Sequence, residues 1–304
     1  MKHRIFLLFG ARGQLGTELA WVLSLLGSVI EADQAECDLC DEPALRAFIR
    51  QVCPTLIVNA AAYTAVDKAE SERALATKVN ATAPGIMAEE AALLRIPLVH
   101  YSTDYVYDGR ATTPYTEEHP TAPLSVYGRT KRDGDAAIVA AGCSHLVFRT
   151  TWVYGHHGAN FVRTILRLAR TRDSLNIVND QYGAPTWARL LAEATALAIQ
   201  RAELIGWDHV SGIYHVSAAG RTNWCEFAET IVTYAQELGL LAEAPVARIA
   251  PTTAAAYGAA APRPENSVLD NGKLAMTFGF GLPDWKGSLR QFLADPASRT
   301  LRED

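Results

Sequence analysis

The stretch Ile-Phe-Leu-Leu-Phe at residues 5–9 runs directly into Gly-Ala-Arg-Gly-Gln-Leu-Gly at residues 10–16. A continuous apolar run is typical of a strand that is buried on both faces of a parallel sheet. Glycines at this spacing let the chain turn tightly and bring backbone N–H groups close to a pyrophosphate at a helix start. The spacing differs from Gly-x-Gly-x-x-Gly. Its place directly after the first strand still favours a dinucleotide site over a plain strand-to-helix turn.

The next strand, expected at Ser28–Ala32, ends at an acidic residue that bears on cofactor choice. Asp33 could accept hydrogen bonds from the adenosine ribose and repel a 2′-phosphate, which favours NADH. Arg12 lies close enough in sequence to accept that phosphate instead, so NADPH stays open. Asp38 and Leu39 are expected near the adenine ring.

Further strands and helices alternate along the chain. Strands are expected at 55–59, 97–101, 146–153 and 213–216, and helices at 17–26, 42–52, 161–170, 190–201 and 224–238, with a helical region at 66–95 broken near Pro84. This alternation predicts an α/β fold, a doubly wound parallel sheet of the Rossmann type with right-handed crossovers. Ligands of such sheets bind beyond the carboxyl ends of the strands. The glycine loop, the small residues Ala60, Ala61 and Ala62 with Tyr63, and Thr103 all fall at that edge.

Tyr127 and Lys131 are spaced for carbonyl chemistry. They form the only Tyr-x-x-x-Lys pair in the sequence. On a helix both side chains would share one face. A nearby ammonium favours the phenolate, so we expect Lys131 to lower the pKa of Tyr127 and make it a general acid. A surface helix with an extended lysine is the competing interpretation.

Composition excludes several function classes. A net charge of −5, without a basic run, argues against a nucleic-acid binder. No apolar stretch is long enough to span a bilayer, so we expect a cytoplasmic protein with no membrane partner. Five cysteines do not suggest a disulfide framework. Cys37 and Cys40 match Cys-x-x-Cys but lack further zinc ligands nearby, so we interpret them as packing residues.

Residues 108–124 are rich in Thr, Pro and Gly and predict a loop that folds over the site. From residue 244 onward the chain is richer in Pro, Ala and Gly, which suits a smaller domain. We therefore expect a dinucleotide-binding domain at 1–155, with 188–217 adding a helix and a strand to it. Residues 156–187 and 218–304 would form a smaller C-terminal substrate-binding domain.

These residues resemble the extended short-chain dehydrogenase/reductase family over nearly the whole chain. The glycine loop and Tyr-x-x-x-Lys are shared throughout that family. More specific segments lie at 58–70, 101–107, 123–131, 179–186 and 263–267. They are similar to the branch of reductases that act on the 4-keto group of a nucleotide-linked 6-deoxysugar. The resemblance implies NADPH or NADH as the cofactor and a small-molecule nucleotide sugar as the substrate.

The resemblance also assigns roles to residues. Thr103 would hydrogen-bond the substrate carbonyl, Tyr127 would protonate its oxygen, and Lys131 would hold the nicotinamide ribose. The substrate would also contact Asp104, Trp152, Asn160 and Arg263, and Arg263 suits a diphosphate because a guanidinium can form two parallel hydrogen bonds. Residues expected to bind the cofactor are Gly10, Arg12, Gly13, Gln14, Leu15, Asp33, Asp38, Leu39, Ala60, Ala61, Ala62, Tyr63, Tyr127 and Lys131.

One position departs from the family. Some members bind magnesium between two subunits, through a Glu in the first helix and a second Glu after Gly-Ala-Pro-Thr. Glu18 fits the first place, but Arg189 occupies the second and could pair with a Glu instead. We therefore expect no structural metal, and a homodimer is left open.

Two other functions compete with reduction. A 4,6-dehydratase or 4-epimerase of the same family is the nearest. Dehydratases place Asp then Glu after the catalytic Thr, whereas Tyr105 follows Asp104 here. The other is a non-catalytic relative such as the regulatory subunit of methionine adenosyltransferase, which would not require Thr103, Tyr127 and Lys131 together.

Overall fold

A six-stranded sheet forms the centre of the molecule in a computed structural model that describes residues 4–241 and 246–298. All its strands are parallel, in the order β10-β5-β4-β3-β1-β2. The strands are β1 (Ile5–Phe9), β2 (Ser28–Ala32), β3 (Leu56–Asn59), β4 (Leu98–Thr103), β5 (His145–Thr150) and β10 (Gly212–His215). Both faces are covered, so β1, β3, β4 and β5 are almost wholly buried, as their apolar runs predicted. The doubly wound α/β fold is confirmed.

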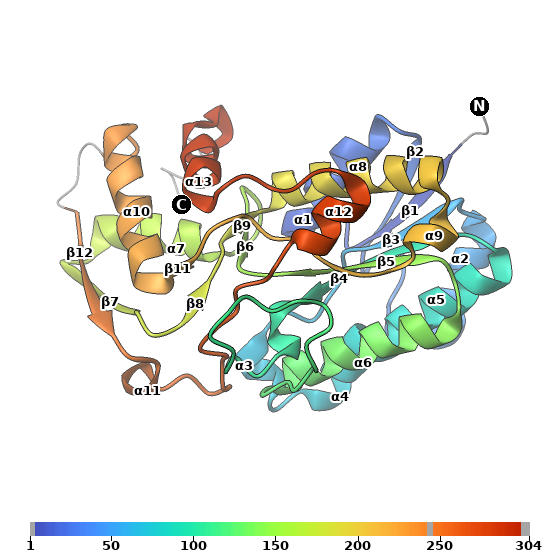
Figure 1. The fold of residues 1–304 in the computed structure, drawn as a ribbon, viewed down its shortest axis with the longest axis horizontal. Helices are drawn as coiled ribbons and strands as arrows, with labels where there is room; N and C mark the ends of the chain where they lie inside the picture. The colour runs from blue at the N-terminus through green and yellow to red at the C-terminus, as the bar shows by residue number, and fades with distance from the viewer. Residues whose placement is uncertain (1–3, 242–245, 299–304) are drawn as a thin grey trace.

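Helices cover both faces of this sheet (Figure 1). On one face lie α1 (Gln14–Ser24), α8 (Ala188–Ile205) and α12 (Gly272–Phe278), whose apolar side chains share a core with β1, β3, β4 and β5. On the other lie α2 (Glu42–Val52), α5 (Ala83–Leu94) and α6 (Val126–Ala141). The short α9 (Trp207–Val210) joins α8 to β10. Among the described residues, no helix is both long and apolar enough to cross a bilayer.

The region expected as one helix broken near Pro84 is divided differently. It consists of α3 (Val66–Ala69), α4 (Arg73–Thr77), a π-helical turn η1 (Lys78–Thr82) and α5. Pro84 lies in the first turn of α5, where a missing N–H costs little. The π turn directs the Asn80 side chain at the backbone of Tyr63, whose N–H it accepts at 2.8 Å and whose carbonyl it donates to at 3.0 Å. The helical region is therefore interrupted at the π turn, and the Asn80 side chain of that turn stabilises the segment that follows β3.

A smaller lobe lies beside the carboxyl ends of the strands (Figure 1). Its helices are α7 (Phe161–Thr171), α10 (Trp224–Glu237), α11 (Ala254–Tyr257) and α13 (Trp285–Ala294). Three two-stranded sheets pair β7 (Ser174–Val178) with β12 (Arg248–Thr252), β6 (Val153–Tyr154) with β9 (Thr186–Trp187), and β8 (Tyr182–Gly183) with β11 (Thr222–Asn223). Side chains of α7, α10 and α13 form a core of their own.

The chain crosses between these two parts several times. Residues 188–217 supply α8 and β10 to the sheet, and Leu274 and Phe278 of α12 return to the core beside α8. We propose a division into two domains in which α12 belongs with the sheet, because it packs there and not against the smaller lobe. The outermost limits expected for the domains, at residues 1 and 304, lie outside the described residues.

Candidate active site

Two neighbouring elements deliver the polar residues at the sheet edge. Strand β4 ends at Thr103, and a 3-10 turn η2 (Asp104–Val106) follows at once. Helix α6 begins beside it, because the Ser125 hydroxyl caps the helix by accepting the Gly128 N–H at 3.1 Å. The cap places Tyr127 and Lys131 on consecutive turns of one helix, as the spacing predicted.

A cavity of about 570 Å³ lies at this edge. Its lining includes most of the residues that the sequence suggested, namely Gly10, Gly13, Gln14, Leu15, Ala60, Ala61, Ala62, Thr103, Asp104, Tyr127, Lys131 and Trp152. It also includes residues that sequence reasoning missed, namely Thr64, Val66, Tyr101, Ser102, Tyr105, Thr150, Thr151, Val153 and Trp224. Several of these are strand-end neighbours of residues already named, so the carboxyl-edge rule could have found them.

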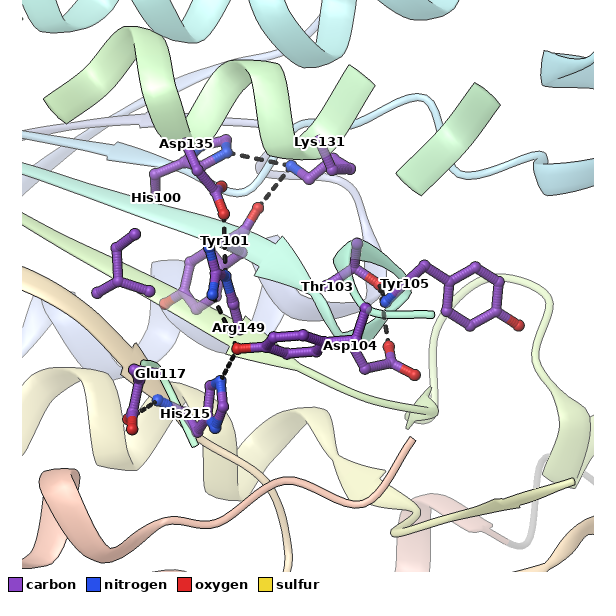
Figure 2. Close-up of polar contacts among 12 residues, drawn as sticks. His100, Tyr101, Thr103, Asp104, Tyr105, Glu117, Lys131, Asp135, Arg149 and His215 are labelled. Atoms are coloured by element: carbon purple, nitrogen blue, oxygen red, sulfur yellow. Dashed lines mark hydrogen bonds and ion pairs between the residues drawn. The ribbon is translucent and has the colours of Figure 1, made fainter. Parts of the chain in front are cut away.

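Asp104 and Thr103 form the polar floor of the cavity. The Thr103 hydroxyl donates to Asp104 Oδ1 at 2.9 Å and accepts the Tyr105 N–H at 3.2 Å (Figure 2). Burial raises the pKa of Asp104 to about 6, and the hydroxyls of Ser267, Thr103 and Thr151 oppose that rise. Its second oxygen, Oδ2, is buried without a hydrogen-bond partner in the described part of the chain. This oxygen is free to accept a hydrogen bond from a ligand.

Tyr127 differs from expectation in its acidity. Burial raises its pKa to about 12, while a hydrogen bond with Thr103 opposes the rise. The Lys131 ammonium does not provide the expected lowering. Lys131 Nζ instead donates to the Tyr101 carbonyl at 2.6 Å and lies 3.1 Å from His100 Nε2. The expectation was wrong for this arrangement because helical spacing fixes the shared face but not the side-chain rotamer.

A second cavity, of about 290 Å³, lies where the adenosine was expected. It shares Gly10, Ala61 and Ala62 with the larger cavity, and its further lining residues include Asp33, Asp38, Leu39, Tyr63, Cys37 and Cys40. Arg12 is largely exposed beside it, with Nε 2.6 Å from Asp33 Oδ2. The two groups proposed to select the cofactor thus pair with each other, and the rim carries both signs of charge.

The glycine loop fits a dinucleotide. Gly10 has φ +74°, and a Cβ there would lie 2.6 Å from the Ala61 backbone nitrogen. A Cβ on Gly16 would lie 1.9 Å from the Gly10 carbonyl oxygen. Only glycine therefore lets the loop, the first turn of α1 and the 60–62 segment approach this closely. Of these residues, Gly10, Ala61 and Ala62 line both cavities.

Two predicted substrate residues, Trp152 and Arg263, lie beside the smaller lobe. Trp152 has φ +47° and stacks on Trp224, with ring centroids 3.5 Å apart. Arg263 lines a third cavity, of about 220 Å³, together with Trp224, Phe161 and Tyr257. Its Nη2 lies 2.8 Å from Asp67 Oδ2, so Arg263 forms an ion pair while its guanidinium still borders a cavity.

Asn160 is placed differently. It does not line any of the three cavities described above. Its amide caps α7 by accepting the Arg163 N–H at 3.1 Å, and it donates to Gln14 Oε1 at 3.0 Å and the Gly155 carbonyl at 2.8 Å. The fold uses these bonds to join α7 to the glycine loop, and the substrate contact expected for Asn160 stays a prediction.

Behind the cavity lies a buried polar chain that sequence reasoning missed (Figure 2). Asp135 pairs with Arg149 at 3.1 Å, and Arg149 donates to the Tyr107 hydroxyl at 2.8 Å. That hydroxyl lies 2.7 Å from His215 Nε2. Burial lowers the pKa of His215 to about 3. The chain links α6, β5, the loop after β4 and β10.

Glu18 and Arg189 form the ion pair that the sequence suggested. Arg189 Nε lies 3.1 Å from Glu18 Oε2, and its Nη1 pairs with Asp295 beyond α13. No group of three or more His, Cys, Asp or Glu side chains arranged for a metal occurs within residues 4–241 and 246–298. The guanidinium therefore supplies a positive charge beside Glu18.

Comparison with known proteins identifies the family. Residues 3–298 match the family model described as RmlD substrate binding domain. A dTDP-4-dehydrorhamnose reductase from Burkholderia thailandensis is 45% identical over 92% of this chain and 95% of its own, and the Escherichia coli K12 enzyme of that name is 42% identical over 94% and 96%. This chain belongs to the dTDP-4-dehydrorhamnose reductase family. It is accordingly an oxidoreductase that uses NADPH or NADH.

Solved structures of dTDP-4-dehydrorhamnose reductases agree with this assignment. The Clostridium acetobutylicum protein is 34% identical, with a TM-score of 0.87 over 95% of this chain and 98% of its own. The Bacillus anthracis protein, solved in complex with NADP, is 31% identical, with a TM-score of 0.86 over 96% and 99%. The resemblance to extended short-chain reductases drawn from the sequence is therefore confirmed.

Proposed function

We propose that this chain reduces the 4-keto group of dTDP-4-dehydro-L-rhamnose (dTDP-6-deoxy-L-lyxo-4-hexulose) to dTDP-L-rhamnose. One observation carries the proposal. Tyr127, Thr103 and Asp104 line the same 570 Å³ cavity as Gly10 and Gly13. A proton donor therefore faces the space next to the dinucleotide loop, which is the arrangement that a carbonyl reduction requires.

The residues divide the reaction between them. A bound nicotinamide dinucleotide supplies the hydride that reaches C4. Tyr127 donates its phenolic proton to the carbonyl oxygen, so the C=O becomes CH–OH. Its pKa is raised to about 12, so the phenol carries its proton at neutral pH. Burial makes it a weaker acid than an ordinary tyrosine, and the hydrogen bond with Thr103 opposes that effect. Thr103 orients the carbonyl oxygen, and Asp104 Oδ2 accepts a hydrogen bond from a sugar hydroxyl.

Arg263 and Trp152 would hold the nucleotide end of the substrate. The 220 Å³ cavity beside Arg263 shares Trp224 with the 570 Å³ cavity. A substrate lying across Trp224 would place its sugar near Tyr127 and its diphosphate near the guanidinium. Arg263 can release Asp67 for this purpose because that carboxylate is about half exposed and readily solvated.

Two observations favour reduction over the competing functions. Tyr105 occupies the position after Asp104, where elimination needs a second carboxyl group. Burial raises the pKa of Tyr105 above its ordinary value, so it is a poor base. A purely regulatory subunit has no need of Tyr127 and Thr103 at a cavity beside the dinucleotide loop.

We place the reaction in the cytoplasm, where both nucleotide sugars and reduced nicotinamide cofactors are present. The partners are small molecules, and no nucleic acid or membrane is required. A homodimer remains compatible with this mechanism, since every residue named in it comes from one chain.

To test the proposal, the protein is given dTDP-6-deoxy-L-lyxo-4-hexulose together with NADPH or with NADH, and the loss of absorbance of the reduced cofactor is measured. Tyr127→Phe should fold and bind cofactor but lose turnover by about 10²–10⁴-fold, the usual contribution of a general acid. The matched control is Tyr214→Phe, which removes a buried phenol that donates to the Val210 carbonyl away from the cavity.

Two results would contradict the proposal. An unchanged rate in Tyr127→Phe would favour a binding role. Turnover of a nucleotide sugar without net consumption of NADPH or NADH would indicate an epimerase or dehydratase.

A further inference from the structure

His100 lies behind the catalytic lysine and outside both cofactor cavities. It occupies the middle of β4 and is completely buried. Its Nε2 is 3.1 Å from Lys131 Nζ, and its Nδ1 is 3.0 Å from Asn59 Nδ2 on the neighbouring strand (Figure 2 shows His100 beside Lys131). Asn59 is also completely buried. Nothing in the mechanism above uses either residue.

The orientation of the Asn59 amide decides where the imidazole proton lies. Asn59 Oδ1 accepts the Ala61 N–H at 3.1 Å, so its NH₂ group must face His100. An amide NH₂ only donates hydrogen bonds. His100 Nδ1 must therefore be the unprotonated acceptor, and a neutral ring then carries its proton on Nε2. That N–H points at Lys131 Nζ.

Two donors facing each other would repel, so the contact requires a lone pair on Lys131. We propose that His100 is a positioning residue that, oriented by Asn59, stabilises the neutral, inward-facing form of Lys131 against its ammonium form. In this state Nζ accepts from His100 Nε2 and donates to the Tyr101 carbonyl. The inference deepens the proposed function and rests on it, because it assigns a protonation state to the lysine of the same site.

The surroundings of Lys131 favour the neutral form without excluding the cation. The negative charge that acts on Lys131 is the Asp135 carboxylate, one turn further along α6. Asp135 also forms an ion pair with Arg149 of β5, at 3.1 Å. Tyr127, one turn earlier on the helix, is neutral at ordinary pH. Burial lowers the pKa of Lys131 to about 8, with Asp135 opposing, so the ammonium prevails at pH 7 and the neutral amine prevails above about pH 8. Burial also lowers the pKa of His100 well below its ordinary value.

A consequence follows for the pH dependence of the enzyme. A neutral lysine must take up one proton from solvent before it can act as an ammonium toward the cavity, and the ammonium loses its contact with His100. Raising the pH favours the inward amine. Activity that needs the cation should therefore fall as pH rises through the pKa of Lys131.

The first test reads the two protonation states directly and needs no substrate. ¹⁵N spectra of the eight histidines should show His100 as the Nε2–H tautomer. A ¹³Cε titration of the six lysines, with Lys131 assigned by its loss in Lys131→Met, should show one group titrating about two units below an ordinary lysine. An Nδ1–H tautomer, or an ordinary Lys131 titration, overturns the proposal.

The second test changes His100. In His100→Gln the side-chain carbonyl can accept from the ammonium, so the Lys131 titration and the basic limb of kcat/KM should both move up by about one pH unit. The matched control is His145→Gln, another buried histidine, which bonds the Cys143 carbonyl and should leave both unchanged. An unmoved Lys131 titration in folded His100→Gln overturns the proposal.

A third variant covers failure of His100→Gln to fold. Asn59→Asp exchanges the donor facing Nδ1 for an acceptor while keeping an oxygen for the Ala61 N–H. The ring proton should move to Nδ1 in the ¹⁵N spectrum, and a retained Nε2–H tautomer overturns the proposal. If the enzyme fails to reduce the nucleotide sugar while these spectra appear as expected, the proposed function is wrong and the inference about His100 stands.

Discussion

Asp104 couples the stability of the protein to the chemistry of its cavity. An ionised carboxylate loses hydration on burial, and only one of its oxygens gains a hydrogen bond in the described part of the chain. Its pKa therefore rises to about 6, from an unfolded value of 3.8. The neutral form is the stable one in the fold. The contribution of Asp104 to the free energy of unfolding is thus greatest below pH 3.8 and declines until the pH reaches about 6.

Asp104→Asn should remove this decline. Between pH 4 and pH 7 the variant should gain stability relative to wild type by about 2 kcal/mol, since each unit of pKa shift corresponds to about 1.4 kcal/mol. Urea unfolding at both pH values measures the difference, and turnover should fall because an acceptor for the substrate is lost. Asp133→Asn, at a half-exposed carboxylate on α6, serves as the control. Parallel pH profiles for wild type and Asp104→Asn would show that the buried carboxylate carries no such cost.

The sequence predicted the positions of the residues at the site better than the contacts of their side chains. Tyr127, Thr103 and the glycine loop were predicted because helix spacing and strand ends fix backbone positions. The inward turn of Lys131 was not, because it depends on His100 and the Tyr101 carbonyl, which belong to another element. The contact of the Asn160 amide with Gln14 was likewise not predicted, since only the fold brings these two residues near each other.

At the scale of elements, α6 must lie very close to the turn after β4. A Cβ on Gly128 would lie 2.2 Å from the Tyr105 carbonyl oxygen. The glycine therefore lets the first turn of α6 rest on η2, so that Tyr127 and Thr103 line one cavity. Tyr105 packs edge-on against the Tyr127 ring with centroids 5.7 Å apart, which closes the same contact from the other side.

Gly128→Ala should displace α6 from η2. In an open helix the change would stabilise the protein by up to about 1 kcal/mol, but here the clash with backbone should reverse the sign. We expect a lower thermal midpoint and a loss of turnover of at least about tenfold, because small misplacement of a proton donor is costly. Gly287→Ala in α13, where a Cβ would meet nothing within 4 Å, is the matched control and should be neutral or stabilising. Equal behaviour of the two variants would mean that the close approach of α6 is not required.

Most strands of the central sheet were predicted to within one or two residues, because each is an apolar run that ends at polar or turn-forming residues. The strand expected at 146–153 ends three residues earlier, at Thr150, and the short strands of the smaller lobe were not predicted. The π turn at Lys78–Thr82 was not predicted. Its Asn80 amide is satisfied by the backbone of Tyr63 and by Thr130, contacts that bridge 17 and 50 residues of sequence. A local pattern cannot report a turn that is stabilised by distant partners.

At the scale of the whole molecule, Arg189 joins the sheet to the end of the chain. It follows the β9 strand, reaches Glu18 of α1, and pairs with Asp295 beyond α13. Its guanidinium also lies over the Trp187 ring, 5.0 Å from the centroid. The sequence indicated the pair with Glu18 but not the third member. Asp295 is 106 residues away from Arg189, in a region whose packing the sequence left undefined.

Because the Glu18 side chain is buried, its charge must be balanced at this junction. In wild type the balance comes from Arg189, so a chelator should leave both the thermal midpoint and turnover unchanged. Arg189→Met should lower the free energy of unfolding by about 3 kcal/mol, the usual cost of leaving a buried charge unpaired. Added magnesium should not restore it, because two carboxylates at a surface junction make a poor cage.

Arg189→Glu tests whether the positive charge of Arg189 replaces a metal ion beside Glu18. The variant should be at least as unstable as Arg189→Met in chelator, since three carboxyl groups then meet without a counter-charge. Magnesium should raise its thermal midpoint in proportion to the logarithm of the ion concentration, because the ion binds the folded state alone. Differential scanning fluorimetry across a magnesium series measures this. Two results would contradict this explanation: a thermal midpoint of wild type that rises with magnesium, or one of Arg189→Glu that does not. Either would mean that the charge of Arg189 does not decide whether a metal ion binds beside Glu18.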